Sequence, residues 1–111
     1  MIFVTGPLFA GKEEVICGCL GWTRADFAAH GLRDVQELAA NCEDLAALAE
    51  ELAKKDVVIA TEVGGGVVPI DAAKRHSRER AGRLSCLLAQ RADTVVRVCC
   101  GIPQVLKGEL P

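Results

Sequence analysis

The chain has 111 residues, 50% of them hydrophobic and 25% charged, and its formal net charge is −2 at pH 7. This length supports one hydrophobic core, so we expect a single domain over residues 1–111, and the composition excludes a disordered chain. The weak net charge excludes a bulk electrostatic surface for nucleic acid or anionic lipid, and no apolar run approaches the roughly 18 residues of a membrane span.

The first predicted elements are a short apolar strand and two helical segments. The run Met1–Thr5 is too short for a helix and predicts a buried strand. Residues 12–20 favour a glycine-interrupted helix, and residues 23–29 favour a second helix with Thr23 as its N-cap. Residues 35–38 indicate a further short strand.

The middle of the chain contains the most regular helical pattern. From Asn41 or Cys42 to Lys55, leucines recur along one face, which predicts an amphipathic helix. The apolar run Val57–Ala60 predicts a second buried strand, and residues 62–69 form a glycine-rich loop.

A long helix and a strand close the predicted domain. The helix runs from Ile70 or Asp71 to Arg91, with Asp71 as a plausible N-cap, and residues 94–99 predict the last strand. We expect the tail after Gly101 to be poorly ordered.

Strands separated by helices favour parallel pairing with right-handed crossovers. We therefore expect an α/β, three-layer P-loop NTPase-like domain whose small, mostly parallel sheet has three or four strands. Sites in such sheets lie at the carboxyl ends of the strands. The loops after Thr5, Thr61 and Cys100 are the candidates.

A phosphate-binding motif follows the first strand. The segment Gly6–Lys12 fits GxxxxGK between a predicted strand and a predicted helix, which is the context that this motif needs. Backbone N–H groups of such a loop and the helix N-terminus bind phosphate oxygens, and Lys12 would reach the β- and γ-phosphates of ATP or GTP. The predicted nucleotide-binding residues are Gly6, Pro7, Leu8, Phe9, Ala10, Gly11, Lys12 and Glu13. A plain glycine-containing turn is the alternative.

Glu13 departs from the motif. The usual residue here is Ser or Thr, whose hydroxyl ligates Mg²⁺. A carboxylate also binds Mg²⁺ but brings negative charge towards the triphosphate, so Glu13 predicts either altered metal binding or loss of catalysis.

A second motif carries a family resemblance. Residues 60–101 contain VGGGVVP and then Arg75, Arg78, Gly82 and Arg83 in an RxxRxxxGR pattern. Together with the N-terminal glycine motif, this resembles the adenosylcobinamide kinase / adenosylcobinamide-phosphate guanylyltransferase family of cobalamin biosynthesis. The resemblance implies an adenosylcobinamide kinase with a corrinoid substrate, a required Mg²⁺ and a homo-oligomeric assembly.

The chain also departs from that family pattern. Ser85-Cys86 replaces Asn-Gln, Thr61 replaces an Asn, and the middle segment is shorter. That segment holds the histidine that becomes guanylylated in the family, and His30 lies too close to Glu37 for this role. We therefore expect phosphoryl transfer rather than guanylyl transfer.

Several residues are candidates for the chemistry. Glu62, at the end of a strand, would act with Lys12 in catalysis by placing an acceptor hydroxyl, or would merely cap a loop. Possible phosphate or substrate contacts are Glu37, Gly64, Arg75 and Arg78, although the basic segment suits a solvated face or a subunit interface equally well. Trp22, the sole tryptophan, is either a core or interface anchor or a stacking surface.

The six cysteines show no zinc-ligand spacing, and MIFVTGPLF has no basic segment typical of a secretory signal. We expect a cytoplasmic protein with buried, reduced thiols. Three functions are open: a kinase of the family type, a degenerate nucleotide-binding or oligomeric interaction module without turnover, and a structural domain with an empty loop.

Overall fold

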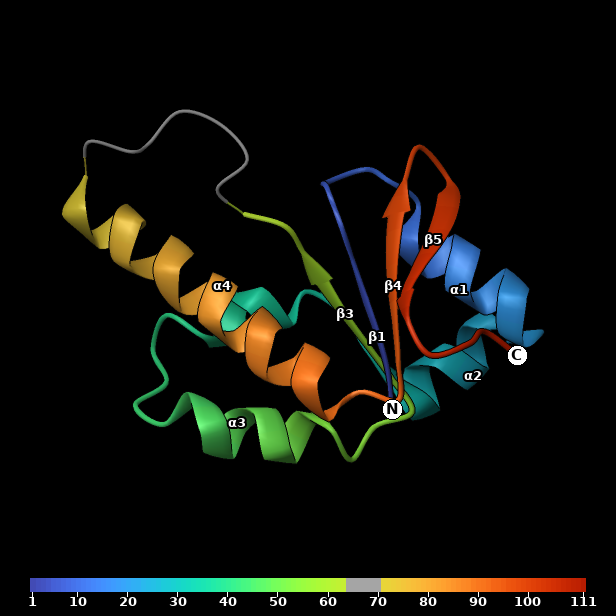
Figure 1. Cartoon of the computed structure of the whole chain (residues 1–111), viewed down its shortest axis with the longest axis horizontal. Coiled ribbons are helices and arrows are strands. Elements are labelled where there is room, and N and C mark those ends of the chain that lie inside the picture. The colour runs from blue at the N-terminus through green and yellow to red at the C-terminus, as the bar shows by residue number, and fades with distance from the viewer. Residues whose placement is uncertain (64–70) are drawn as a thin grey trace.

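The computed structural model describes residues 1–63 and 71–111 (Figure 1). The strands are β1 (Ile2–Gly6), β2 (Gly31–Leu32), β3 (Val57–Thr61), β4 (Thr94–Cys99) and β5 (Ile102–Lys107). The helices are α1 (Lys12–Leu20), α2 (Arg24–His30), the 3-10 helix η1 (Val35–Leu38), α3 (Leu45–Leu52) and α4 (Ala72–Arg91).

The described strands form one sheet in the order β2-β3-β1-β4-β5. β1 is central, because Val4 pairs in parallel register with Ile59 of β3 on one side and with Val96 of β4 on the other. β2 extends the parallel part beyond β3, and β5 pairs antiparallel with β4. Parallel neighbours need crossover connections, which the intervening helices supply.

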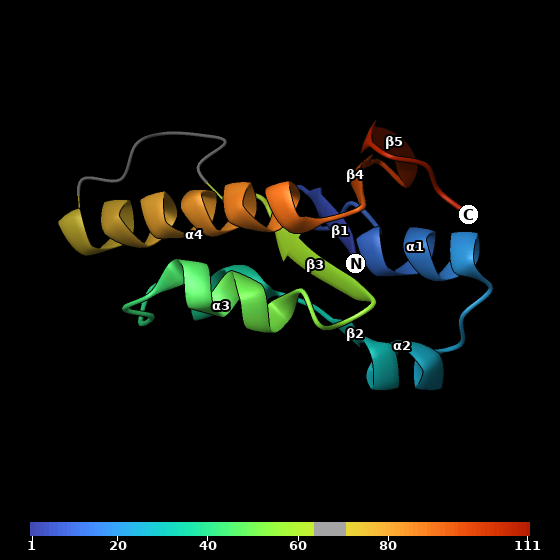
Figure 2. The ribbon, with the colours of Figure 1, turned by 60° about the horizontal axis from the view of Figure 1, so that its bottom comes forward.

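Alternating strand residues build a core on each face of the sheet. Phe3 and Val58 belong to the apolar cluster that packs on η1, α3 and α4, whereas Val4 and Ile59 belong to the cluster that packs on α1 and α2. Figures 1 and 2 show α3 and α4 on one side of the sheet and α1 and α2 on the other. The expected three-layer α/β architecture is therefore confirmed.

Three details of the sequence-based prediction are wrong. Among the described residues the sheet has five strands rather than three or four, because Gly31–Leu32 pairs with β3 and the chain turns back after Cys99 to form β5. Residues Val35–Leu38 form a 3-10 helix instead of a strand. The helix expected from residue 41 or 42 begins only at Leu45, because the Asp44 carboxylate accepts a hydrogen bond from the Ala47 N–H.

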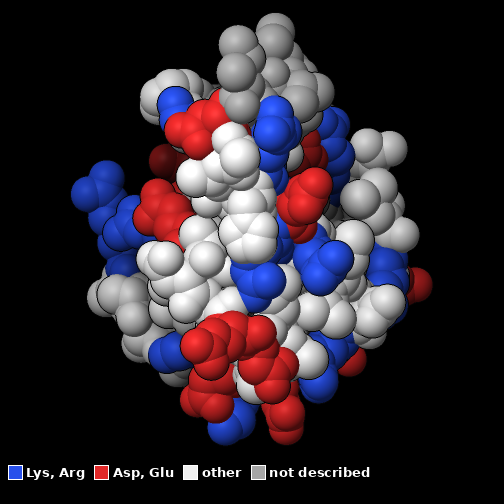
Figure 3. Space-filling model, turned by 90° about the vertical axis from the view of Figure 1, so that its left-hand side faces the viewer, with Lys and Arg blue, Asp and Glu red and all other residues white. Residues whose placement is uncertain are grey.

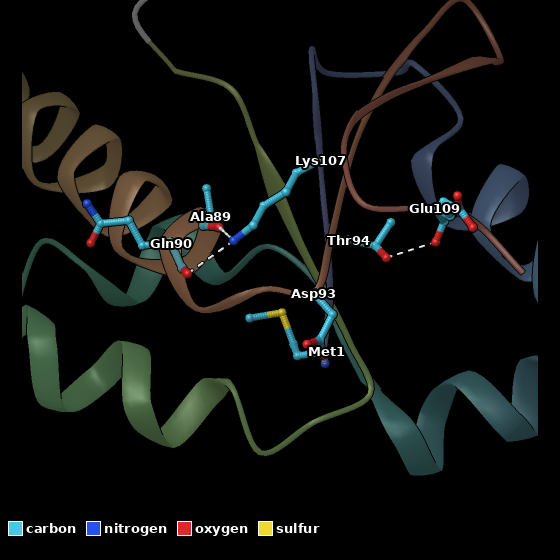
Figure 4. A network of polar contacts seen from close by, with 7 residues as sticks. All are labelled: Met1, Ala89, Gln90, Asp93, Thr94, Lys107 and Glu109. Carbon is cyan, nitrogen blue, oxygen red and sulfur yellow. Dashed lines mark hydrogen bonds and ion pairs between the residues drawn. The ribbon is translucent and has the colours of Figure 1, made fainter.

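The tail after Gly101 is ordered, contrary to expectation. Lys107 of β5 donates to the carbonyl oxygens of Ala89 and Gln90 at 3.1 and 3.2 Å, and so satisfies two free acceptors at the end of α4 (Figure 4). The Thr94 hydroxyl donates to the Glu109 carbonyl oxygen at 2.9 Å. These contacts fasten the tail to the sheet and explain why local composition misled the prediction.

The cysteines are unpaired but not buried. Cys19, Cys86, Cys99 and Cys100 are exposed, while Cys17 and Cys42 are half-buried. The expectation of buried thiols is therefore wrong. No helix of the described residues is long and apolar enough to cross a membrane.

The first testable prediction concerns the core beneath α4. Leu88 is 0% exposed, so Leu88→Ala leaves a cavity and should lower the free energy of unfolding by about 2–5 kcal/mol. Leu106 of β5 is 55% exposed, and Leu106→Ala should change the free energy of unfolding by no more than about 0.5 kcal/mol. Urea unfolding followed by circular dichroism measures both, and equal effects would contradict this account of the core.

Candidate functional site

The glycine loop leaves the central strand and is held from both sides. Gly6 has φ +154°, and a Cβ there would overlap the Val98 carbonyl oxygen of β4, so only glycine fits. The Glu62 N–H donates to the Gly6 carbonyl oxygen at 2.8 Å, and the Gly101 N–H donates to the Ala10 carbonyl oxygen at 2.9 Å. The ends of β3 and β4 thus fix the loop at the switch point of the sheet.

Lys12 lies inside this loop. It opens α1 directly after Gly11, which adopts the left-handed φ of +80°. Only 8% of the residue is exposed, and its Nζ donates to the Pro7 carbonyl oxygen at 2.7 Å. Burial lowers the pKa of Lys12, while the negative charges of Asp34, Glu62 and Glu14 act in the opposite direction. The loop therefore holds a buried amine where phosphate oxygens would offer it better partners.

A cavity of about 170 Å³ opens beside Lys12. The loop supplies one wall, and Arg33, Asp34, Ile59 and Thr61 supply the other. Asp34 has φ +55°, and its carboxylate accepts the Thr61 hydroxyl at 3.4 Å. The cavity thus places a carboxylate and a buried amine in one site.

Sequence reasoning missed Asp34. It placed a strand at residues 35–38, which hid Asp34 in the preceding turn. The strand is instead Gly31–Leu32, so Asp34 follows its carboxyl end, where sites of parallel sheets lie. The signal that could have found it is the position of Asp34, two residues after the short segment Gly31–Leu32.

Glu13 lies in the first turn of α1, at the rim of the cavity. Its carboxylate is 3.4 Å from the Arg33 guanidinium, and its side chain is 32% exposed. In the described part of the chain, no three His, Cys, Asp or Glu side chains gather into a metal site. Mg²⁺ commonly uses one or two carboxylates together with phosphate oxygens and water, so the Glu13 carboxylate fits that donor set.

Glu62 is held by an arginine. Arg97 of β4 donates from Nε and a terminal nitrogen to the two Glu62 oxygens at 2.7 and 3.0 Å. The carboxylate raises the pKa of Arg97, first through these hydrogen bonds and then through its charge. This bidentate pair lies between the ends of β3 and β4, and Arg97 is a second residue that sequence reasoning missed.

The remaining predicted contacts lie elsewhere. Glu37 is exposed on η1, while Arg75 and Arg78 lie in the first turns of α4. None of these three is among the described residues that line the loop cavity. Gly64 lies outside the described residues.

The end of the molecule where α4 begins has no single-sign surface. Figure 3 shows Lys and Arg interspersed with Asp and Glu there, with acidic groups gathered at the lower edge, towards α3. Arg80 donates to the carbonyl oxygens of Ala39 and Cys42 and so fastens α4 to the segment before α3. Part of the basic segment therefore has a structural role.

Comparison with known proteins identifies the family. Residues 2–106 match the family described as cobinamide kinase / cobinamide phosphate guanyltransferase. The chain belongs to this family and has its P-loop NTPase fold.

Two curated relatives agree with this assignment. The chain is 34% identical over 76 residues to the bifunctional adenosylcobalamin biosynthesis protein CobP of Pseudomonas aeruginosa. This match covers 68% of the chain and 44% of CobP. The chain is also 36% identical over 72 residues to the bifunctional adenosylcobalamin biosynthesis protein CobU of Escherichia coli K12. This match covers 65% of the chain and 40% of CobU. The matched part therefore spans less than half the length of either relative.

The second testable prediction concerns the loop lysine. Lys12→Met removes the amine and keeps the apolar stem, so ATP and GTP affinity should fall at least about tenfold in calorimetric titration. Thermal stability should not fall, because the variant no longer buries a charge. Lys54→Met, which alters an exposed lysine, is the control and should leave nucleotide affinity unchanged. Unchanged affinity in Lys12→Met would contradict phosphate binding by this loop.

The same variant gives a pH prediction. Because burial lowers the pKa of Lys12 in the folded protein, the unfolded chain binds more protons between that lowered value and the ordinary value of about 10.4. Across this window the unfolding free energy of the wild type, relative to Lys12→Met, should therefore rise with pH. Urea unfolding at a series of alkaline pH values measures this difference, and a fall with rising pH would be the opposite of the expectation.

Proposed function

We propose that this member of the cobinamide kinase / cobinamide phosphate guanyltransferase family transfers the γ-phosphoryl group of ATP or GTP to a hydroxyl group of adenosylcobinamide. The observation that carries the proposal is the cavity in which the buried Lys12 amine, the glycine loop and the Asp34 carboxylate meet. Phosphoryl transfer depends mainly on such positioning and on charge compensation. The two curated relatives are named as bifunctional adenosylcobalamin biosynthesis proteins, which supports the choice of acceptor.

Each part of the loop has a role in this proposal. Backbone N–H groups of the loop and the N-terminus of α1 bind phosphate oxygens. Lys12 exchanges the Pro7 carbonyl oxygen for the β- and γ-phosphates. Glu13 would hold a Mg²⁺ ion together with phosphate oxygens and water, and the bound ion would neutralise charge on the phosphates. Glu62 and Arg97 form an ion pair that joins the ends of β3 and β4 on either side of β1, and would keep the base of the loop in place.

The acceptor hydroxyl needs a carboxylate to orient it and take its proton. As the acceptor oxygen bonds to the γ-phosphorus, the bond from that phosphorus to the bridging oxygen breaks and the proton passes to the carboxylate. The sequence predicts Glu62 as the residue that orients this hydroxyl. Asp34 is the stronger candidate, because it lines the loop cavity whereas Glu62 is held by Arg97.

A nucleotide-binding or oligomeric interaction module without turnover is the alternative function. It is favoured by Glu13 at the position where the motif requires Ser or Thr, and by a match that covers less than half of each relative. Guanylyl transfer is not proposed. A cytoplasmic location and a homo-oligomeric state stay predictions of the sequence analysis.

The third testable prediction separates these functions by titration with ATP and GTP, each with and without Mg²⁺. A kinase should bind at least one nucleotide with an affinity that Mg²⁺ increases, and should then phosphorylate adenosylcobinamide in a product assay. Glu13→Ser should raise that rate if the loop carboxylate weakens metal binding. Binding without a Mg²⁺ effect and without turnover would favour the non-catalytic module, and the absence of nucleotide binding would refute both.

The fourth testable prediction concerns Asp34. Asp34→Asn keeps a residue that tolerates the left-handed backbone but removes the base, so kcat should fall by about 10²-fold. Nucleotide affinity in the absence of Mg²⁺ should change little. Glu50→Gln, on the exposed face of α3, removes one negative charge elsewhere and is the control. Equal rates for wild type and Asp34→Asn would exclude Asp34 as the base.

A further inference from the structure

A second cavity lies between α1 and α2. Its volume is about 440 Å³, within the range of small-molecule sites. The lining residues are Glu13, Glu14, Cys17, Trp22, Arg24, Phe27, Ala28 and Arg33. Glu13, Glu14 and Arg33 also line the loop cavity, so the two spaces are neighbours with a shared wall.

Local structure fixes the two aromatic rings of this cavity. The capping box of α2, in which Thr23 and Asp26 bond reciprocally, sets the direction of the helix directly after Trp22. Phe27 is 5% exposed and packs over Gly31, where no side chain interferes. Trp22 is half-buried, and its ring centroid lies 5.9 Å from that of His30. Both aromatic side chains line the cavity, and the half-buried Trp22 offers more surface to a ligand than the buried Phe27.

Polar groups complete the lining. Arg24 is exposed at the start of α2, and the Arg33 side chain is 66% exposed. Guanidinium groups donate to sugar, amide or ring acceptors and also stack on flat rings. Burial, reinforced by Glu13 and Glu14, raises the pKa of the Cys17 thiol.

The position of Arg33 indicates which molecule enters. Asp34, the residue proposed to act on the acceptor hydroxyl, directly follows Arg33, which lines both cavities. A ligand between α1 and α2 would therefore lie next to the residue that the proposed function assigns to the acceptor hydroxyl. An aromatic wall with a nearby guanidinium suits a purine with its ribose.

We propose that the cavity between α1 and α2 binds the adenosyl group of the acceptor, with Trp22 as the stacking surface and Arg24 as a hydrogen-bond donor to the adenosyl group. This inference rests on the proposed function, because it places one part of adenosylcobinamide while the hydroxyl-bearing part reaches the phosphate loop. It predicts that Trp22 distinguishes adenosylcobinamide from cobinamide that lacks the adenosyl group.

The test, which is the fifth prediction, compares the affinities of these two corrinoids by calorimetry. Trp22→Leu keeps an apolar side chain but removes the flat ring, and should weaken adenosylcobinamide binding about tenfold while leaving cobinamide binding within about twofold. Trp22→Phe should restore most of the affinity. Arg24→Gln should weaken adenosylcobinamide binding at least about threefold, and Arg91→Gln, an exposed arginine at the end of α4, should not.

Trp22 also offers a direct signal. It is the only tryptophan, and the chain contains no tyrosine, so indole emission reports on this cavity alone. Adenosine should change the emission saturably in the wild type and in Lys12→Met, because the cavity does not use the phosphate loop. No saturable change up to about 10 mM adenosine would overturn the proposal.

The remaining outcomes separate the inference from the proposed function. If Trp22→Leu and Arg24→Gln weaken ATP or GTP rather than adenosylcobinamide, the cavity holds the nucleotide base and the inference is wrong. If adenosylcobinamide binds with the expected Trp22 dependence but no nucleotide binds, the kinase proposal fails and the cavity assignment stands. If Trp22→Leu melts below the assay temperature, the comparison of Arg24→Gln with Arg91→Gln decides.

Discussion

The site depends on the position of β1 between β3 and β4. Because β1 is central, the loop that leaves it is bonded on both sides, through the Gly6 carbonyl to Glu62 and through the Ala10 carbonyl to Gly101. The close approach of Gly6 to the Val98 carbonyl leaves no room for a side chain. The loop is thereby held rigidly enough to bury a lysine, while the apolar layers on both faces of the sheet maintain the strand order.

Burial of the Lys12 charge is unfavourable for folding, and the proposed binding of phosphate would offset that cost. The amine donates to the Pro7 carbonyl oxygen, and the carboxylates of Asp34, Glu62 and Glu14 act on it through their charge. A phosphate would supply charge-assisted hydrogen bonds that a neutral carbonyl cannot match. Asp34 in a left-handed backbone and Glu62 held by Arg97 surround the same point. Such clustering of an unusual backbone conformation, a lowered pKa and paired charges is typical of functional sites.

The cavity between α1 and α2 adjoins the cavity beside Lys12. In this short chain the two helices that connect β1 to β2 cover one face of the sheet and also enclose a space next to the phosphate loop. Glu13 lies at the boundary of both cavities, where its carboxylate meets Arg33. Glu13, the residue that departs from the motif, could therefore contact a ligand in either cavity.

The sequence by itself determined the α/β class, the glycine loop after the central strand, the long helix after Asp71 and the membership of the family. Apolar periodicity, glycine spacing and caps are local properties, so they can be read from the sequence. It did not determine β2 and β5, or the position of Asp34 after β2. A two-residue strand has no detectable period. The exposed β5 pairs with β4, and Lys107 fastens it to Ala89 and Gln90 at the end of α4, 18 and 17 residues earlier in the chain. Only the tertiary structure brought Asp34 to Lys12, joined Glu62 to Arg97 and enclosed Trp22 beside the loop, because each of these pairings spans residues that no local pattern connects.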